Sequence, residues 1–290
     1  MRRKFITLSL CLSCMTAISI AAYMTYAHSH GVLAAKTVAA ASSENTTSKT
    51  ASSSKTKKVD SSALTSSLAK IIASNSDIST AVSLIDLDSG QQINAGLNDT
   101  VFRGASTTKV LTAAAYLHSV EQGGATLDQY IDGDTANNLI QRMIENSDND
   151  AWYALNDYLG YDTLQSYGTA LGMTNWTAYP NTLTAADEAT LLAKLYQGKL
   201  LNASNTKLLL SYMENSDNQD LIAAALPSSA TLYHKYGELE GELHDAAIIK
   251  YNGHTFALVI FTNNEQESLD DYTSSASYIQ ELTAAVINTY

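Results

Sequence analysis

Two segments that each look like a β-hairpin lie on either side of a long segment whose apolar residues have helical spacing. Of all features of the 290-residue chain, this arrangement restricts the possible folds most strongly. The first hairpin segment is STAVSLIDLDSGQQINAGL, which starts at Ser79, alternates in polarity and has Asp88-Ser89-Gly90 as its turn. The second is AAIIKYNGHTFALVIFTN, in which Asn252-Gly253 separates two apolar runs. Each segment is expected to form a pair of antiparallel strands.

The middle of the chain, from about Thr107 to Leu226, has apolar residues three or four positions apart, which predicts helices. The residues that carry this period are Val110, Leu111, Ala114, Leu117, Leu139, Ile140, Met143, Ile144, Leu191, Leu192, Leu195, Leu208, Leu209 and Tyr212. A further helix is expected at 274–287. The pattern predicts an α+β fold, with an antiparallel sheet built from both ends of the chain, flanking helices and an inserted all-helical lobe at about 107–226. We expect a functional site in the groove between sheet and lobe.

The N-terminal residues 1–35 have the pattern of a signal peptide or a membrane anchor. Three basic residues at positions 2–4 precede an uncharged stretch from Phe5 to Tyr26. Small residues near Ala27 and Ala35 permit cleavage, so both interpretations stay open. Either one predicts export, giving a secreted protein or one anchored in the membrane on the extracellular, cell-wall side. Both cysteines, Cys11 and Cys14, lie in this stretch, so the exported part has neither a disulfide nor a thiol nucleophile.

Residues 36–62 are rich in Ala, Ser, Thr and Lys, which predicts a disordered tether before a folded domain at 63–290. Charge is divided between the two parts. From Ser61 onward there are 9 Lys and Arg against 27 Asp and Glu, whereas 36–60 carries 5 Lys against Glu44 and Asp60. The acidic domain has no basic face for phosphates, so nucleic acid is excluded as a partner. The basic tether is either simply solvated or attracted to an anionic surface.

The segment FRGASTTKVLTAAAYL places Ser106 at the start of a predicted helix, with Lys109 three residues later. That spacing puts the amine and the hydroxyl on one face, and the helix start stabilises negative charge on an oxygen. A serine hydroxyl becomes nucleophilic when a base removes its proton, and a lysine serves as that base once burial or a nearby cation lowers its pKa. Such a short pattern also occurs as a helix cap followed by a surface lysine.

The order of three motifs favours the catalytic interpretation. Ser147-Asp148-Asn149 follows 41 positions after Ser106, and Lys235-Tyr236-Gly237 follows 88 positions after Ser147. With these motifs the chain resembles the class A β-lactamases and their relatives among the penicillin-recognising serine hydrolases, whose Ser-x-x-Lys, Ser-Asp-Asn and Lys-Thr-Gly motifs occur in this order. The resemblance covers nearly the whole folded part and implies a β-lactamase/transpeptidase-like fold.

The resemblance also implies catalytic roles. Ser106 would attack an amide or lactam carbonyl, Lys109 would take or relay its proton, and Ser147 would pass a proton to the leaving nitrogen. Asp148 would be a buried structural acceptor.

Substrate-binding roles follow in the same way. Asn149 would hold the amide side chain of the substrate, and Lys235 would supply positive charge, with Tyr236 and Gly237 completing the third motif. The backbone amides of Ser106 and Glu238 would form the oxyanion hole. The substrate would be a β-lactam or a peptidoglycan-type peptide. No metal or cofactor is expected, since the six histidines lack ligand spacing, and the protein is expected to be a monomer.

The pentapeptide Glu-Asn-Ser-Asp-Asn occurs twice, at 145–149 and at 214–218. The second copy precedes Lys235 too closely for the family pattern, and its surroundings resemble a late pair of helices. We therefore assign the functional motif to the first copy and interpret the second as a polar helix end.

Two departures from the family pattern affect turnover. The segment LGMTNWTAYPNTLTAADEATLL lacks the loop glutamate that activates the deacylating water in class A enzymes. Its acids, Asp187 and Glu188, fit the first turn of a helix capped by Thr184. Tyr236 replaces a small hydroxyl residue, and acidic residues at 238, 240 and 242 follow it, which opposes anionic ligands unless they form only a solvated strand edge.

Three functions are compatible with these features. The first is an exported serine hydrolase that forms an acyl-enzyme on Ser106. The second is a penicillin-binding sensor that is acylated without turnover. The third is a catalytically silent cell-surface domain.

Overall fold

The computed structural model describes residues 59–269 and 271–290. The predicted leader at 1–35 and most of the predicted tether lie outside these residues. Within the described part, no helix is both long and apolar enough to span a membrane.

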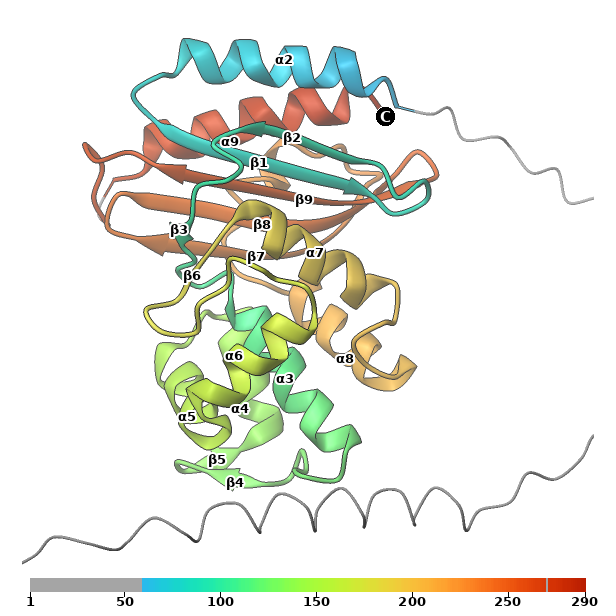
Figure 1. The fold of residues 1–290 in the computed structure, drawn as a ribbon, viewed down its shortest axis with the longest axis vertical. Helices are drawn as coiled ribbons and strands as arrows, with labels where there is room; N and C mark the ends of the chain where they lie inside the picture. The colour runs from blue at the N-terminus through green and yellow to red at the C-terminus, as the bar shows by residue number, and fades with distance from the viewer. Residues whose placement is uncertain (1–58, 270) are drawn as a thin grey trace, which may run out of the picture. The chain divides into compact units, whose positions relative to one another are not determined.

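The core of the fold is a five-stranded antiparallel sheet with the order β2-β1-β9-β8-β7 (Figure 1). Its strands are β1 (Ser79–Asp86), β2 (Gln92–Gly96), β7 (Thr231–Leu239), β8 (Glu242–Tyr251) and β9 (His254–Asn263). The two predicted hairpins are confirmed as β1-β2 and β8-β9. In the second, Asn252 and Gly253 both have positive φ, 48° and 81°, as the tight turn requires. Pairing of β1 with β9 joins the two ends of the domain in one sheet.

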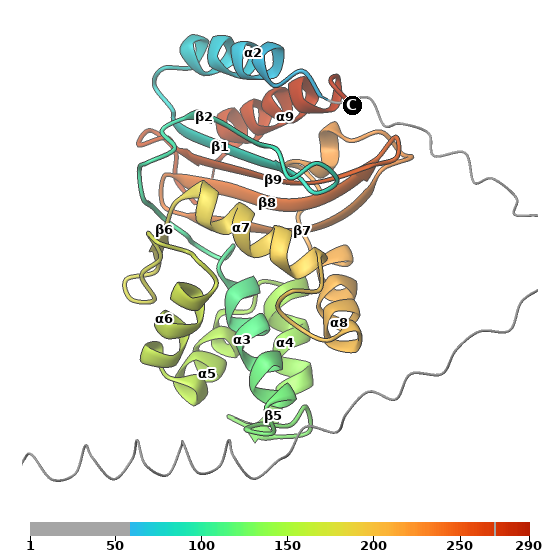
Figure 2. The ribbon, with the colours of Figure 1, turned by 45° about the vertical axis from the view of Figure 1, so that its right-hand side comes forward.

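Two helices, α2 (Ser61–Ser74) and α9 (Thr273–Ile287), cover one face of the sheet (Figures 1 and 2). Leu64 and Leu68 of α2 and Ile279 and Leu282 of α9 are fully buried in one apolar cluster. The predicted tether at 36–62 therefore extended too far. The buried Val59 and the helix cap at 60 already belong to the domain, because the Asp60 carboxylate accepts the first free N–H groups of α2.

The lobe between β2 and β7 is mainly helical, as predicted, but not entirely so. Its helices are α3 (Lys109–Glu121), α4 (Ala136–Glu145), α5 (Asn149–Leu159), α6 (Tyr161–Ala170), α7 (Ala185–Tyr196), α8 (Ala203–Glu214) and the 3-10 helix η1 (Ala223–Ala225). It also contains two small sheets, β3 (Phe102–Arg103) with β6 (Thr182–Leu183) and β4 (Tyr130–Ile131) with β5 (Asp134–Thr135).

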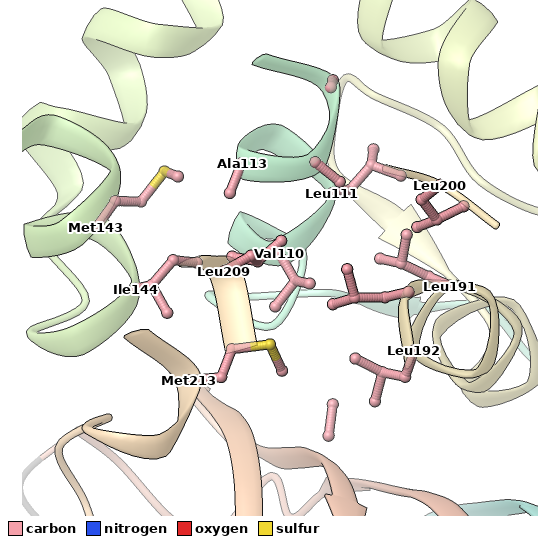
Figure 3. Close-up of a cluster of buried hydrophobic side chains, with 14 of the residues drawn as sticks. Val110, Leu111, Ala113, Met143, Ile144, Leu191, Leu192, Leu200, Leu209 and Met213 are labelled. Atoms are coloured by element: carbon pink, nitrogen blue, oxygen red, sulfur yellow. The ribbon is translucent and has the colours of Figure 1, made fainter. Parts of the chain in front are cut away.

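Helix α7 lies across the face of the sheet opposite to α2 and α9 and connects the sheet with the lobe (Figure 2). Figure 3 shows its Leu191 and Leu192 in a cluster with Val110 of α3, Ile144 of α4 and Met213 of α8. All five side chains are fully buried. This packing fixes α3, which follows Ser106, relative to the sheet.

Glu188 departs from this apolar packing. Asp187 forms the predicted capping box with Thr184, but Glu188 is 0% exposed and neither of its carboxylate oxygens has a hydrogen-bond partner among the described residues. Burial, with a contribution from Asp187, raises the pKa of Glu188 from 4.5 to about 8. Glu188 is therefore a neutral acid inside the core at neutral pH.

We expect Glu188 to contribute a loss of stability as pH rises, because its folded pKa lies above its unfolded one. The loss begins above 4.5, levels off above about 8 and amounts to about 5 kcal/mol at most. Glu188→Gln should remove this dependence, measured as urea unfolding at pH 5 and at pH 8. Glu214→Gln at an exposed position of α8 is the control. An unchanged pH dependence in Glu188→Gln would contradict the assignment.

Candidate active site

Ser106 lies in a turn between β3 and α3, three residues before the first residue of the helix. Asn181 holds this turn in place: its carbonyl accepts from the Gly104 N–H at 2.9 Å, and its side-chain amide donates to the Ala105 carbonyl at 3.0 Å. Ala105 has a positive φ of 45°. Ser106 is partly exposed, and neither its N–H nor its hydroxyl forms a hydrogen bond within the described residues. Both groups are therefore available to a substrate.

Lys109, in the first turn of α3, has a fully buried side chain. Its Nζ donates to the Ser147 carbonyl at 2.6 Å, to Ser147 Oγ at 3.2 Å and to Asn149 Oδ1 at 2.7 Å. The sequence predicted this amine over the Ser106 hydroxyl, whereas in the structure its hydrogen bonds go to the second motif. A buried ammonium group needs several acceptors, and the motif at 147–149 supplies them.

The second motif lies on the connection between α4 and α5. Ser147 has a φ of 57°, which turns its carbonyl and hydroxyl toward Lys109. Asp148 caps α5 by accepting from the N–H groups of Asp150 and Ala151, and Arg142 lies 2.9 Å from its other oxygen. Asp148 therefore acts as a structural acceptor, as the resemblance implied, although its side chain is 23% exposed rather than fully buried.

The second copy of the pentapeptide packs against the first. It follows the end of α8, and Ser216 is buried with its hydroxyl donated to a neighbouring carbonyl. Asp217 accepts from the Asn146 amide at 3.0 Å and donates its N–H to the Glu145 carbonyl at 2.7 Å. The interpretation as a polar helix end was therefore incomplete. Asp217 supports the first copy, and its charge reaches Lys235 and Tyr236.

The third motif lies on β7, one of the two edge strands of the five-stranded sheet. An edge strand has a neighbour on one side only, so alternate N–H groups of the strand point away from the sheet without a strand partner. The predicted oxyanion role requires a free N–H group of this kind at Glu238. Gly237 makes close approach to the nucleophile turn possible, because a Cβ at this position would lie 2.9 Å from the Ser106 nitrogen. Lys235 is fully buried, with its Nζ 3.1 Å from the Tyr236 carbonyl and 4.0 Å from the centre of the Tyr236 ring.

Both lysines of the site lose basicity through burial. Burial lowers the pKa of Lys109 from 10.5 to about 8, against a smaller opposing effect of Asp148. Burial and then the charge of Lys109 lower the pKa of Lys235 to about 7. The pKa of Tyr236 is raised by burial, Glu238 and Asp217, and a hydrogen bond with Ser147 opposes this only partly. Near neutral pH the site therefore holds amines that exchange protons readily, beside a neutral phenol.

A cavity of about 290 Å³ opens beside Ser106 and Asn149. Its wall also contains aromatic residues that the sequence motifs did not indicate. They are Trp152 and Tyr153 of α5, Tyr161 of α6 and Tyr179 of the loop before β6. The signal for the first two was their position, three and four residues after Asn149 on one helix. Tyr179 lies in a loop, where the sequence has neither the helical nor the strand pattern of apolar residues, so nothing in the sequence indicated its place in the cavity wall.

The predicted site residues thus fall into one region of the molecule. Hydrogen bonds join Lys109 to Ser147 and Asn149, and Gly237 approaches the backbone at Ser106. No group of His, Cys, Asp and Glu side chains in the described residues has the geometry of a metal site.

A model of the beta-lactamase enzyme family matches residues 63–290. The chain belongs to the beta-lactamase enzyme family. The match covers the sheet, the lobe and all three motifs, and it supports a serine hydrolase. No curated protein sequence matches the chain.

Solved structures agree with this family in their fold. A mutant of PBP-A in an acyl-enzyme complex with penicillin G is 24% identical with a TM-score of 0.71, over 78% of this chain and 95% of that one. PBP-A itself is 23% identical with a TM-score of 0.70, over 78% and 94%. An ancestral class A β-lactamase is 24% identical with a TM-score of 0.71, over 78% and 100%. At these identities the likeness shows a shared fold, and the predicted β-lactamase-like α+β fold is confirmed.

Proposed function

We propose that this member of the beta-lactamase enzyme family forms an acyl-enzyme on Ser106 with a β-lactam or a cell-wall peptide amide. One observation carries the proposal: the amine of Lys109, with its pKa lowered to about 8, donates to Ser147 and to Asn149, and Asn149 lines the same cavity as Ser106. A buried amine of this kind can accept a proton near neutral pH.

The proposed acylation step transfers one acyl group and one proton. Ser106 Oγ bonds to the carbonyl carbon while its proton passes to the neutral amine of Lys109. The backbone N–H groups of Ser106 and Glu238 stabilise the oxyanion. The carbon–nitrogen bond then breaks, and the proton returns through Ser147 Oγ, 3.2 Å from Lys109 Nζ, to the leaving nitrogen. The product is an ester on Ser106.

We propose that water releases this ester slowly. The loop between α6 and α7 contributes Ala178, Tyr179, Pro180 and Asn181 to the cavity wall, none of which is an acid. The acids that follow in α7 do not line the cavity: Asp187 belongs to the helix cap and Glu188 is buried in the core. Among the described residues that line the cavity, Glu238 is the single carboxylate, and it comes from β7 rather than from this loop. This favours a penicillin-binding sensor as the second candidate function.

Intact-protein mass spectrometry with benzylpenicillin tests both proposals. We expect an adduct with the mass of one penicillin, mapped by proteolysis to the peptide that contains Ser106, and still present hours after excess penicillin is removed. Absence of any adduct would contradict the acyl-enzyme and favour a catalytically silent surface domain. Rapid loss of an adduct that does form would exclude the sensor and show turnover.

We also propose that the protein is exported and acts at the cell surface, either secreted or held in the membrane by residues 1–35, as a monomer. The basic and then uncharged residues at the N-terminus support this proposal. N-terminal sequencing of the protein from its own cells separates the two forms. A start after position 27 or 35 indicates cleavage, and a start at Met1 indicates an anchor.

A further inference from the structure

The aromatic wall of the cavity is unusual in its exposure. Tyr179 is 78% exposed and Tyr153 is 52% exposed, although both side chains line the cavity beside Ser106. The rings stand in pairs, Trp152 with Tyr153 at 5.3 Å between centres and Tyr161 with Tyr179 at 5.8 Å. Aromatic faces left open to solvent around a cavity are available for a ligand.

The charge at this cavity is negative. Glu238 is its single charged lining residue in the described part of the chain, and no Lys, Arg or His lines it. Nearby cations are already engaged. Arg103 bonds Glu242 at 2.8 Å and the Glu240 carbonyl at 2.7 Å. Lys109 is buried among oxygen acceptors, and its Nζ lies 5.7 Å from the centre of the Trp152 ring, so Tyr153, Tyr161 and Tyr179 are the rings left for a ligand cation. The charge of the buried Lys235 reaches Glu238, but Glu238 forms no ion pair within 4.0 Å among the described residues, so its carboxylate stays open to a ligand beside the rings.

Ring faces and a carboxylate together select a cation. The face of an aromatic ring carries partial negative charge, so it attracts an ammonium group, and a carboxylate nearby adds ionic attraction. A neutral apolar group would contact the rings and leave Glu238 without a partner. An anionic group would be repelled by Glu238.

We propose that this cavity binds an alkylammonium group on the acyl side of the substrate, so that the enzyme selects acyl donors with a positively charged side chain. The inference rests on the proposed function, because it takes Ser106 as the nucleophile beside the cavity. The acyl side is indicated because Trp152 and Tyr153 follow Asn149, the residue assigned to the acyl amide, on the same helix. The selecting residues are Glu238 and Tyr179, with the other rings of the wall.

Two penicillins test this selection, since ampicillin and benzylpenicillin differ by one amino group on the acyl side chain. At pH 6.5 an α-amino group is protonated. We expect ampicillin to acylate the wild-type protein about tenfold faster, measured by intact mass over time. Glu238→Gln and Tyr179→Leu should each reduce this ratio toward one. Glu240→Gln, at an exposed position that does not line the cavity, is the matched control and should keep the ratio. Equal rates in the wild-type protein would overturn the inference while leaving the acyl-enzyme intact.

A binding measurement keeps the inference testable without acylation. Benzyltrimethylammonium should quench the fluorescence of Trp152 saturably in Ser106→Ala, and Glu238→Gln should weaken this binding about tenfold. Benzoate, which has the ring but the opposite charge, should not bind. If the cation does not bind, or binds no better than benzoate, the inference is wrong even when penicillin acylates Ser106. If it binds while no penicillin adduct forms on the wild-type protein, the cation site stands and the acyl-enzyme fails.

Discussion

Replacing Ser106 by Ala is expected to abolish the penicillin adduct, with a fall in the acylation rate of about four orders of magnitude or more. In the proposed reaction the Ser106 hydroxyl is the group that the acyl group bonds to, and Ser106 is the one serine that lines the cavity among the described residues. Ser147, the other serine of the predicted catalytic residues, accepts a hydrogen bond from Lys109 at 3.2 Å. The mutation should not affect folding, because Ser106 is partly exposed and its hydroxyl forms no hydrogen bond within the described residues.

The matched control for this experiment is Ser216→Ala, which removes the hydroxyl of the duplicated pentapeptide. Ser216 is buried and its hydroxyl donates to a backbone oxygen of its own turn, so the adduct should form as in the wild-type protein. An adduct of equal size on Ser106→Ala would show that another residue is the nucleophile. Loss of the adduct in Ser216→Ala, with the fold retained by circular dichroism, would give the second pentapeptide a direct role in the reaction.

The fold was predictable from the sequence where local signals and tertiary structure agree. The two hairpins carry their turn residues in the chain itself, as at Asn252-Gly253, and their alternation assigns each strand to the sheet. No helix was predicted at the residues of α2, because its Ser-rich first turn resembles the tether before it. The capping aspartate at 60, in front of Leu64 and Leu68, was the available signal.

The sequence predicted which residues would lie together around Ser106, but not the contacts between them. The order and spacing of three short motifs indicated Ser106, Ser147 and Lys235, since a resemblance of this kind depends on sequence alone. The hydrogen bonds of Lys109 depend on how α3 packs against the connection from α4 to α5, which no local pattern encodes. The support that Asp217 gives to the first pentapeptide is likewise a tertiary contact.

Glu188 shows how two correct local rules can conflict. An acid in the first turn of a helix is favourable near the positive helix end, which explained its position in the sequence. It also lies three and four residues before Leu191 and Leu192, so it shares their buried face. In the structure Glu188 lies on the buried face of α7, and burial raises its pKa so that the carboxyl group is neutral at neutral pH.

Lys109→Met is expected to lower the acylation rate about a thousandfold, because it removes the amine that accepts the Ser106 proton in the proposed reaction. Met has similar length and no charge, so it suits a fully buried position. The wild-type rate should rise with pH as the amine becomes neutral, through its pKa of about 8, and this rise should be absent in the mutant. Rates are measured by intact mass from pH 6 to pH 9.

Lys109→Arg separates proton transfer from charge. The guanidinium group stays protonated throughout this pH range. It therefore keeps a positively charged hydrogen-bond donor beside Ser147 and Asn149, but it cannot act as a base. We expect Lys109→Arg to be as slow as Lys109→Met, while Lys207→Met at an exposed position of α8 acylates at the wild-type rate. Substantial activity in Lys109→Arg would mean that Lys109 contributes charge rather than basicity. Lys235, with its pKa lowered to about 7, would then be the remaining amine able to accept the proton, and Lys235→Met should show the loss expected here for Lys109.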